Sequence, residues 1–484
     1  MDHDDTRRGD ARWLPILLVL VVAEITSAFE MGMMFGALAT ISREFGDPVK
    51  AGWLITAFLL VGAASAALSS RLGDLFGRKR VGLVLLVLAA AGSLLSALAP
   101  TLAVMIVGRA IQGFSAALLP LCVGLVREHV PSRRTGISIG WLAAMATSSA
   151  GAGVMLGGWA VDRLGWPSVF WFSCAHAVAA ALLMAAVLPA SPRRAAEGPL
   201  DLTGGLLFAP AVAALLLAIT RLKSQAGDPL TIGLALAGLL TLAWWARHEW
   251  RHPRPMLDVR LFTQRQIGIT MLLAAMYGLG TSQQMLVILQ LAQQPAWTGI
   301  GLGLSATAAA AIKVPSIAMG LLGAPWSGWL GGRSSGRVAA LWGAVIVLAG
   351  WVLLALWHDS IAALVVATLV ISFGSSALYA GAVVLVTEVA PHERTSEING
   401  QLAVMRSISY AAGTVAMTLL LASDAVSDPA RGPGVFASSA AFDRGLLYVV
   451  ACAAGCVLVI LALPGRRRPD IHRRTLTPPM KAQG

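Results

Sequence analysis

The stretch SSRLGDLFGRKR, residues 69–80, is a short charged segment between two long apolar runs. It combines a carboxylate (Asp74), two glycines (Gly73 and Gly77) and three consecutive basic residues, 78–80. Glycine permits the backbone conformations of a tight reversal. The stretch therefore predicts the polar turn of a hairpin whose two arms are apolar helices.

The composition indicates an all-α polytopic membrane protein. The chain has 484 residues, of which 57% are hydrophobic and 12% charged, and its mean hydropathy is +0.74. Soluble domains average about 45–50% apolar and 25% charged residues. The four cysteines (Cys122, Cys174, Cys452 and Cys456) all fall in apolar runs, so we expect neither disulfides nor a metal site from them.

Fourteen segments are long and apolar enough to span a bilayer, which takes about 20 residues. We place them at 14–40, 52–70, 81–99, 102–126, 137–161, 167–188, 202–220, 229–246, 267–289, 301–324, 338–357, 361–387, 398–421 and 445–463.

Basic residues are unevenly distributed among the connecting segments. The N-terminus and the segments on its side of the membrane hold 26 Lys and Arg residues, against 7 on the other side. Cytoplasmic loops carry such an excess, which predicts a multi-pass protein of the plasma membrane with both termini in the cytoplasm. The basic N-terminal stretch precedes an apolar run too long for a signal peptide, so we expect an uncleaved first helix. The net charge of +12 then reflects topology, and we expect no nucleic-acid partner.

An internal repeat divides the chain. GWLGGRSSGR at 328–337 resembles SRLGDLFGRK at 70–79, and many transporters are built from such repeats. The expected parts are two six-helix halves, a pair of extra helices with a cytoplasmic linker between the halves, and a basic cytoplasmic tail. In chain order they cover 1–188, 189–266, 267–464 and 465–484.

The turn also resembles the loop signature G-x-L-A-D-R-x-G-R-K/R of the major facilitator superfamily. Five residues match the signature: Leu72, Asp74, Gly77, Arg78 and Lys79. Ser70 and Leu75 depart from it. The resemblance implies a fold of two helical halves and a gating role for Asp74, Gly77, Arg78 and Lys79; a topology signal alone is the alternative.

Two further motifs carry the same resemblance. GRAIQGFSAAL from Gly108 is similar to the R-x-x-x-G pattern of the fourth helix, and in relatives its arginine, here Arg109, is tied to proton coupling. GAGVMLGGW from Gly151 resembles the antiporter signature G-x-x-x-G-P-x-x-G-G at Gly153, Gly157 and Gly158, with Val154 in place of the proline. Small residues at this spacing also allow close helix packing, which by itself accounts for the three glycines.

The extra helix pair, the segment PRPMLDVRLF at 253–262 and the first helix together resemble the fourteen-helix drug:proton antiporter family. That family carries an acid followed by A-L-P in its first helix. Here Glu30 is followed by Ala37 and Leu38, with Ala39 in place of the proline.

Four charged side chains are expected near the bilayer centre: Glu24, Glu30, Lys313 and Arg406. Glu24 is about 15 Å into the first helix. Intramembrane charges are costly and usually functional, so these residues predict a polar substrate cavity with switchable ion pairs; structural pairs that never titrate are the alternative. Burial disfavours the charged form of a carboxyl group, which makes Glu24 or Glu30 a candidate proton carrier.

The segment AFEMGMMFG surrounds Glu30 with flexible apolar side chains, among them Met33 and Met34. Methionine adapts its shape to varied ligands, so both are candidates for the substrate cavity. Simple packing or lipid contact is the alternative.

His248 to His252 match the zinc-protease pattern H-E-x-x-H. We expect a basic juxtamembrane loop that faces lipid headgroups here. Zinc binding is disfavoured, because Pro253 follows at once and neighbouring arginines would repel a cation. The sequence therefore predicts no enzyme activity, no bound metal and no cofactor.

The predicted function is proton-driven export of small amphipathic compounds, hydrophobic and in some cases cationic, by alternating access of two halves. Glu24, Glu30 and Arg109 are the candidates for proton coupling, and the expected partners are the substrate, protons and the bilayer, with a monomer as the working unit. The alternative is a transporter of an anionic metabolite that uses Lys313 and Arg406. A sensor is disfavoured because no soluble output domain is present, and a membrane protease would need its motif inside a helix. Substrate identity and the titrating glutamate stay open.

Overall fold

The computed structural model describes residues 3–191, 202–225, 227–252, 255, 259–389, 395–427 and 435–463. Helices occupy all fourteen of the predicted spanning segments. Apolar runs of this length form helices because a bilayer offers no partners to backbone polar groups. The all-helical fold class is confirmed, with one small addition: the two-residue strands β1 (Ala425–Val426) and β2 (Phe436–Ala437) form an antiparallel pair.

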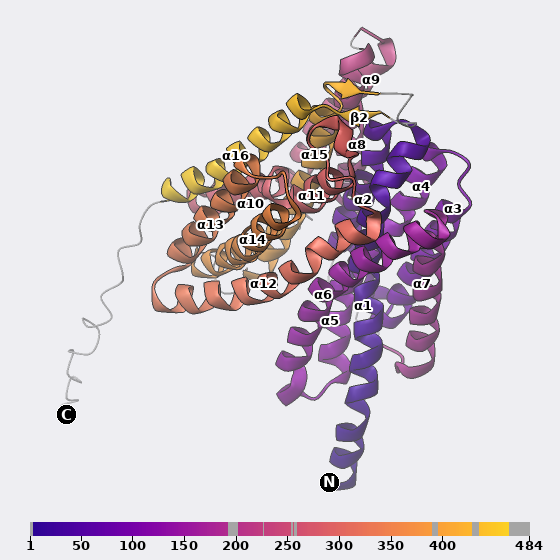
Figure 1. Cartoon of the computed structure of the whole chain (residues 1–484). Coiled ribbons are helices and arrows are strands. Elements are labelled where there is room, and N and C mark those ends of the chain that lie inside the picture. Colours follow the sequence, from indigo (N-terminus) through magenta and orange to yellow (C-terminus); the bar gives the residue numbers. More distant parts are fainter. Residues whose placement is uncertain are drawn as a thin grey trace, which may run out of the picture.

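The helices fall into two bundles joined by a hairpin (Figure 1). The first bundle comprises α1 (His3–Phe45), α2 (Pro48–Phe76), α3 (Arg78–Ala97), α4 (Leu102–Gln112), the 3-10 turn η1 (Gly113–Ala117), α5 (Leu118–His129), α6 (Ser132–Leu164) and α7 (Pro167–Val187). The hairpin is α8 (Leu202–Gln225) and α9 (Pro229–Arg251). The second bundle comprises η2 (Val259–Thr263), α10 (Arg265–Leu279), η3 (Thr281–Gln283), α11 (Gln284–Gln293), η4 (Ala296–Thr298), α12 (Ala306–Arg333), α13 (Gly336–Leu356), α14 (Ile361–Val389), α15 (Thr395–Leu421) and α16 (Ser439–Leu461).

Twelve helical segments in the described part of the chain are long and apolar enough to cross a membrane. The described part of α8 adds a shorter apolar stretch, Leu207–Arg221. The count of fourteen spans and the domain boundaries therefore stay predictions.

The two bundles approach each other at one end of the molecule and diverge toward the other (Figure 1). We call the end where α1 finishes and α16 begins the distal end, and the end that carries the N-terminus the proximal end. Contacts between the bundles join α6 to α12, α2 to α15, and α1 to both α11 and α12. In the predicted topology the distal end is extracellular, which makes this conformation inward-facing.

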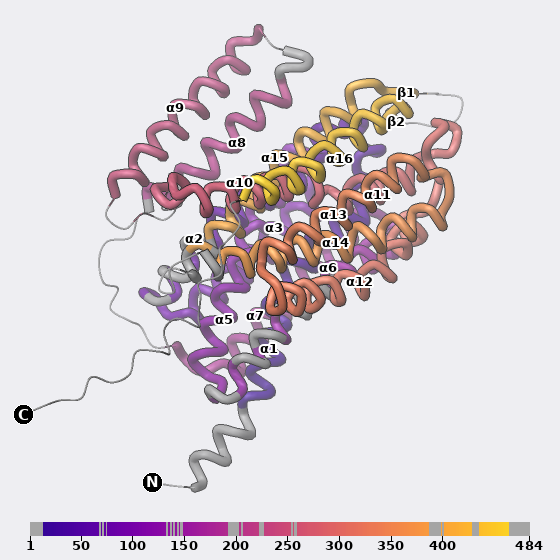
Figure 2. The backbone as a smooth tube through the Cα atoms, turned by 90° about the vertical axis from the view of Figure 1, so that its left-hand side faces the viewer, coloured from indigo at the N-terminus to yellow at the C-terminus, as the bar shows by residue number. Residues whose placement is uncertain are grey.

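The α8–α9 hairpin lies against the seam between the bundles, beside α2 and α15 (Figure 2). Val212 and Leu216 of α8 pack with Trp53 and Leu60 of α2 and with Ala411 of α15. Large apolar side chains on the outer face of α9 are exposed, as expected of a surface that faces lipid.

The turn at 69–80 connects α2 to α3 through Gly77, whose φ of +91° is open to glycine and strained for other residues. Directly after it, Lys79 donates a hydrogen bond to the Ala185 carbonyl (2.8 Å) and another to the Leu188 carbonyl, at the end of α7. Arg337 occupies the same position in the internal repeat. It donates to the carbonyls of Ile460 (3.2 Å) and Leu461 (2.9 Å), at the end of α16.

The basic residue of each repeat thus binds the C-terminal carbonyls of the last helix in its own bundle. Carbonyls at the C-terminal end of a helix carry the negative end of its dipole, which favours a basic side chain there. The repeat therefore has a common structural role in the two bundles.

Two predicted helices are each three pieces. The segment 267–289 is divided into α10, η3 and α11, and the segment 102–126 is divided into α4, η1 and α5 because proline interrupts it. Pro120 has no N–H to bond the carbonyl one turn earlier, and the chain tightens into the 3-10 turn η1 just before it. The turn contains Ser115, whose hydroxyl contributes to the site described next.

Candidate functional site

A polar network around Glu30 lies inside the first bundle, where α1, α3, α4 and η1 meet. The carboxylate is 1% exposed. It accepts a hydrogen bond from the Ser115 hydroxyl (2.9 Å) and a longer one from Ser93 (3.5 Å). Ser93 in turn accepts from the Gln112 amide (2.5 Å), and the Gln112 carbonyl oxygen accepts from Arg109 (2.9 Å). Two polar side chains therefore connect the carboxylate to the guanidinium.

Arg109 is held in place from several sides. Its Nε donates to the Leu54 carbonyl of α2 (3.0 Å). Its guanidinium lies 4.5 Å from the centre of the Phe58 ring, within range of a cation–π interaction. The guanidinium and the Glu30 carboxylate are close enough to attract each other electrostatically. In a buried pair of this kind, the charge of the arginine influences how readily the acid binds a proton.

Glu24 lies six residues earlier on α1 and faces a different environment. Its side chain is buried, with 4% exposed, and its Oε2 has no hydrogen-bond partner in the described residues. The structure does not bring Glu24 into the Glu30 network. Because the two acids are about 120° apart on one helix, each contacts different neighbours.

Lys313 and Arg406 lie in the second bundle, on α12 and α15. Lys313 is 3% exposed, and the described part of the chain offers its ammonium group no hydrogen-bond acceptor or ion-pair partner. Arg406 lies 4.5 Å from the centre of the Tyr379 ring, and its Nε is also without a partner among the described residues. It lines a narrow pocket together with Tyr277 and Tyr379.

None of the ion pairs between described residues joins Glu24, Glu30, Lys313 and Arg406 to one another. The two acids lie in the first bundle and the two bases in the second. The predicted switching of ion pairs in a central cavity therefore stays a prediction in this conformation.

Met33 and Met34 are buried in the main apolar core, 0% and 1% exposed. Met33 packs against Gly157 of α6, and its sulfur accepts a weak hydrogen bond from Ser173 of α7 (3.8 Å). Their contact with a substrate stays a prediction.

The three glycines of α6 lie at two different contacts. A side-chain carbon on Gly153 would meet the Phe29 carbonyl oxygen at 2.5 Å, and one on Gly157 would meet the Met33 carbonyl oxygen at 2.6 Å, both on α1. A side-chain carbon on Gly158 would instead meet the Ala306 carbonyl oxygen of α12 at 2.6 Å. Gly158 thus lies at a close contact between the two bundles, whereas Gly153 and Gly157 lie within one.

The predicted gating residues bond within the first bundle. Arg78 forms an ion pair with Glu128 of α5 (3.1 Å), and the backbone N–H of Lys79 donates to Ser191 (3.2 Å). The Asp74 side chain lies outside the described residues. A gating role for the turn stays a prediction.

A bridge between the bundles that the motifs did not indicate lies at the distal end. Asp162, at the end of α6, accepts hydrogen bonds from the backbone N–H groups of Ala306 (3.2 Å) and Thr307 (2.8 Å) and from the Thr307 hydroxyl (2.5 Å). These are the free N–H groups at the start of α12, where a negative charge is favourable. We call this contact the distal bridge.

Partial burial alone would raise the pKa of Asp162. The hydrogen bonds from Thr307, Ser305 and Ala306 outweigh that effect and hold its pKa below the ordinary value. The distal bridge therefore contains a charged carboxylate over the neutral pH range.

The sequence alone did not indicate several residues of the site. Ser93, Gln112 and Ser115 are uncharged and ordinary in a membrane helix, although Gln112 follows Arg109 at the spacing of one helical turn. Asp162 and Glu128 could have been found from the sequence, because each is an acid beside an arginine at the end of an apolar run, a pattern typical of a charged contact at a helix end.

The expectation of a loop at the H-E-x-x-H pattern was wrong. The helix α9 continues to Arg251 and ends only before Pro253, because the residue before a proline disfavours the helical conformation. Glu249 is fully buried, and the His248 and His252 rings lie 5.3 Å apart. The described residues contain no group of three or more His, Cys, Asp or Glu side chains able to hold a metal ion.

Two helical bundles with buried charges in apolar helices define a polytopic membrane transport protein. A family model described as Major Facilitator Superfamily matches residues 20–311. The chain belongs to this superfamily.

Three relatives illustrate its range. An uncharacterized MFS-type transporter of Mycobacterium tuberculosis is 29% identical over 66% of this chain and 46% of its own length. The puromycin resistance protein pur8 of Streptomyces alboniger is 30% identical over 54% of this chain and 53% of its own. A uridine/deoxyuridine transporter of Lactococcus lactis is 27% identical over 71% of this chain and 74% of its own. The chain spans about half the length of most of the relatives it matches first.

Solved structures share the fold. A mutant of the nucleoside transporter NupG aligns with a TM-score of 0.64 and 13% identity over 92% of this chain and 99% of its own. The POT family transporter PepTSo aligns with a TM-score of 0.63 and 13% identity over 92% and 97% of the two chains.

Proposed function

We propose that the protein is a proton-coupled exporter of small amphipathic compounds, hydrophobic and in some cases cationic, in the plasma membrane. The observation that carries the proposal is the Glu30 network. A buried carboxylate that accepts from two hydroxyls and is connected to a buried arginine is suited to bind and release a proton inside the membrane.

The coupling step follows from this arrangement. Protonation of Glu30 removes its attraction to Arg109, which loosens the contacts among α1, α3 and α4. Rebinding of the negative form restores them. Such a change in packing between helices can bias the two bundles toward one of two conformations. Glu24, whose carboxylate is buried and unpartnered on one side among the described residues, is the second candidate carrier.

The direction of transport is supported by relatives and by sequence. A relative is named for puromycin resistance and others for multidrug resistance, and the Gly153, Gly157 and Gly158 pattern resembles the antiporter signature. The distribution of basic residues supports cytoplasmic termini. We propose a monomer as the working unit.

The test uses purified protein in proteoliposomes with an imposed pH gradient and two probes, puromycin and the lipophilic cation ethidium. We expect Glu30→Gln to lower gradient-driven transport at least about tenfold, because one charge-assisted interaction in a buried site contributes about 1.5–3 kcal/mol. Glu44→Gln, an exposed acid on the same helix, is the matched control and should transport normally. Native, proton-driven transport in Glu24→Gln, Glu30→Gln and the double variant would refute the coupling proposal.

A second candidate function rests on Lys313. An ammonium group buried without a partner in the described residues is a candidate binding group for an anionic metabolite. We expect this candidate to show gradient-dependent uptake or release of an organic anion such as benzoate that is lost in Lys313→Ala. Unchanged anion transport in that variant would remove its support.

A further inference from the structure

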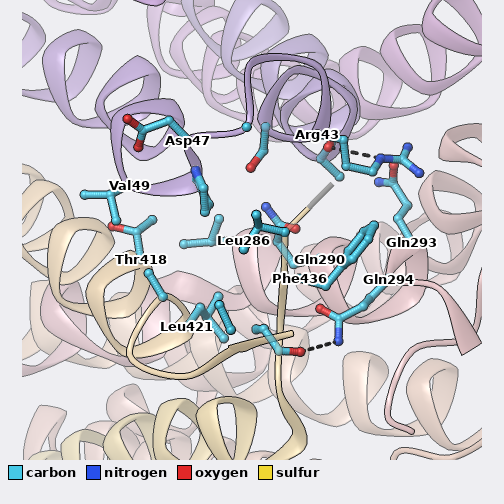
Figure 3. Close-up of a pocket in the computed structure, with 18 of the residues that line it drawn as sticks. Arg43, Asp47, Val49, Leu286, Gln290, Gln293, Gln294, Thr418, Leu421 and Phe436 are labelled. Carbon is cyan, nitrogen blue, oxygen red and sulfur yellow. Dashed lines mark hydrogen bonds between the residues drawn. The ribbon is translucent and has the colours of Figure 1, made fainter. Parts of the chain in front are cut away.

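A pocket lies between the two bundles at the distal end, away from the Glu30 network. Its cavity volume is about 200 Å³. Its walls come from the end of α1, the start of α2, α11, the end of α15, strand β2 and the start of α16 (Figure 3). We call it the distal pocket. A layer of apolar side chains, Leu38 of α1 against Leu286 and Leu289 of α11, lies beside it where the bundles meet.

The polar lining of the distal pocket consists mainly of amides. Gln290, Gln293 and Gln294 lie within about one helical turn at the end of α11 and gather on one side of the pocket (Figure 3). Gln293 is 3% exposed, and neither its amide nitrogen nor its amide oxygen has a hydrogen-bond partner among the described residues. Buried polar groups are usually hydrogen-bonded, so this amide has donor and acceptor capacity that a polar ligand can use.

Gln294, by contrast, is hydrogen-bonded within the protein. Its amide donates to the Ala437 carbonyl (2.8 Å) and to the Thr298 hydroxyl (2.9 Å). This fixes β2, whose residue Phe436 lines the pocket and meets the Trp297 ring edge-on at 5.5 Å. The pocket therefore presents a positioned aromatic ring beside two amides that the described hydrogen bonds leave available.

The charged groups of the pocket are occupied by local contacts. Asp47 accepts from the Lys50 backbone N–H (2.9 Å) and forms an ion pair with its ammonium group (2.9 Å). Arg43 donates to the Ala39 carbonyl (3.3 Å) and to the Thr40 hydroxyl (3.2 Å). No unbalanced carboxylate is thus offered to a cationic ligand by the described lining residues.

We infer that the distal pocket is a binding site for an uncharged ligand that combines a planar ring with hydroxyl or amide groups, as a nucleoside does. An amide both donates and accepts, so Gln290 and Gln293 match hydroxyl and amide groups, and the ring packs on Phe436. The inference rests on the proposed function and deepens it: the site is a distal stage of the transport path for the uncharged members of the substrate class, which it selects by hydrogen bonding.

The first experiment measures binding of radiolabelled uridine to the purified full-length protein by equilibrium dialysis. We expect Gln293→Leu to weaken uridine binding about three- to tenfold, the effect of losing one neutral hydrogen-bonding group, and Gln290→Leu to act in the same direction. Gln264→Leu, an exposed amide at the start of α10, should bind as the native protein does. Equal uridine affinity in all three variants would overturn the inference.

A second measurement does not depend on those substitutions. Val435→Cys, a substitution at an exposed residue of the distal-pocket lining, is labelled with a membrane-impermeant maleimide in sealed proteoliposomes. Uridine should slow the labelling at least about threefold, and ethidium should not, because the described lining offers no free negative charge. Labelling that uridine does not slow, or that ethidium slows more, would refute a site for uncharged ligands.

The result is separable from the proton-coupling proposal. Glu30→Gln removes the proton carrier of the first bundle and leaves the distal pocket unchanged, so it should lose gradient-driven transport and keep uridine binding. If uridine binds and the Gln293 effect appears while no variant is proton-coupled, the distal pocket stands and the proposed function fails. If transport is proton-coupled and uridine does not bind, the proposed function stands and the inference about the distal pocket fails.

Discussion

Removing the carboxylate of Asp162 should open the distal end of the molecule. In this conformation Asp162 accepts three hydrogen bonds from Ala306 and Thr307 across the boundary between the bundles. Opening the distal end must break all three. Asp162→Ala removes this contribution from the distal-closed state and leaves the opposite state unchanged, so the equilibrium moves toward distal-open.

The size of the effect follows from the exposure of the bridge. Hydrogen bonds to a charged group contribute about 1.5–3 kcal/mol when shielded, but Asp162 is exposed to solvent and water replaces part of the interaction. We therefore take about 1–2 kcal/mol for the three bonds together. Because about 1.4 kcal/mol is a factor of ten, the ratio of distal-open to distal-closed molecules should rise about 5- to 30-fold.

The assay is a distance measurement between two spin labels on the reconstituted protein. Glu44 at the end of α1 and Asp443 at the start of α16 are exposed positions at the distal ends of opposite bundles, and their separation lengthens when the distal end opens. Asp359→Asn, which removes an exposed charge between α13 and α14, is the control. A distance distribution in Asp162→Ala identical to that of the native protein would refute the argument.

The same bridge predicts a pH dependence with a defined sign. The folded-state pKa of Asp162 lies below its ordinary value, which is about 3.9 in an unfolded chain. The stabilisation is therefore complete above that value and is lost as the pH falls through the folded pKa. The native protein should show the longer spin-label distance only in strong acid, and Asp162→Ala should lack this step. A transition near neutral pH that disappears in Asp162→Ala would contradict the assignment.

Three further substitutions test the contacts of the bundles. Gly158→Val should prevent closure of the distal end and abolish transport, because the valine side chain would occupy the space of the Ala306 carbonyl oxygen. The spin-label distance and puromycin transport measure this effect. Native transport in the variant would contradict it. Lys79→Met and Arg337→Met should each lower the stability of their own bundle by about 1–2 kcal/mol, since each loses hydrogen bonds to helix-end carbonyls; thermal unfolding in detergent measures it, and an unchanged midpoint in both variants would count against the shared role of the repeat.

The sequence predicted the helices well because span length and apolarity determine them. It placed helices in all fourteen segments, and the internal repeat anticipated the shared position of Lys79 and Arg337. It missed the break at η1 because a single proline in an apolar run interrupts some helices and leaves others continuous: Pro120 follows a 3-10 turn, whereas Pro315 lies inside the continuous helix α12. It also placed residues 248–252 in a loop, whereas helix α9 continues to Arg251 and ends just before Pro253.

The candidate site was only partly predictable. Buried charges such as Glu30 and Arg109 stand out in an apolar sequence, because their burial needs an explanation. The side chains that connect them, Ser93 and Gln112, do not stand out. Their role depends on which helices are neighbours, and that is a property of tertiary packing which one sequence does not contain.

Charged contacts at the two ends of the molecule differ in what they join, and this bears on how the bundles move. At the proximal end Arg78 pairs with Glu128 inside the first bundle. At the distal end Asp162 binds across the boundary. When the distal end opens, the distal bridge is lost, and a contact of similar strength must form elsewhere if both conformations are to be populated. The turn at 69–80 lies at the proximal end and carries several basic residues, so we propose that the two conformations are balanced by exchanging the distal bridge for a proximal contact.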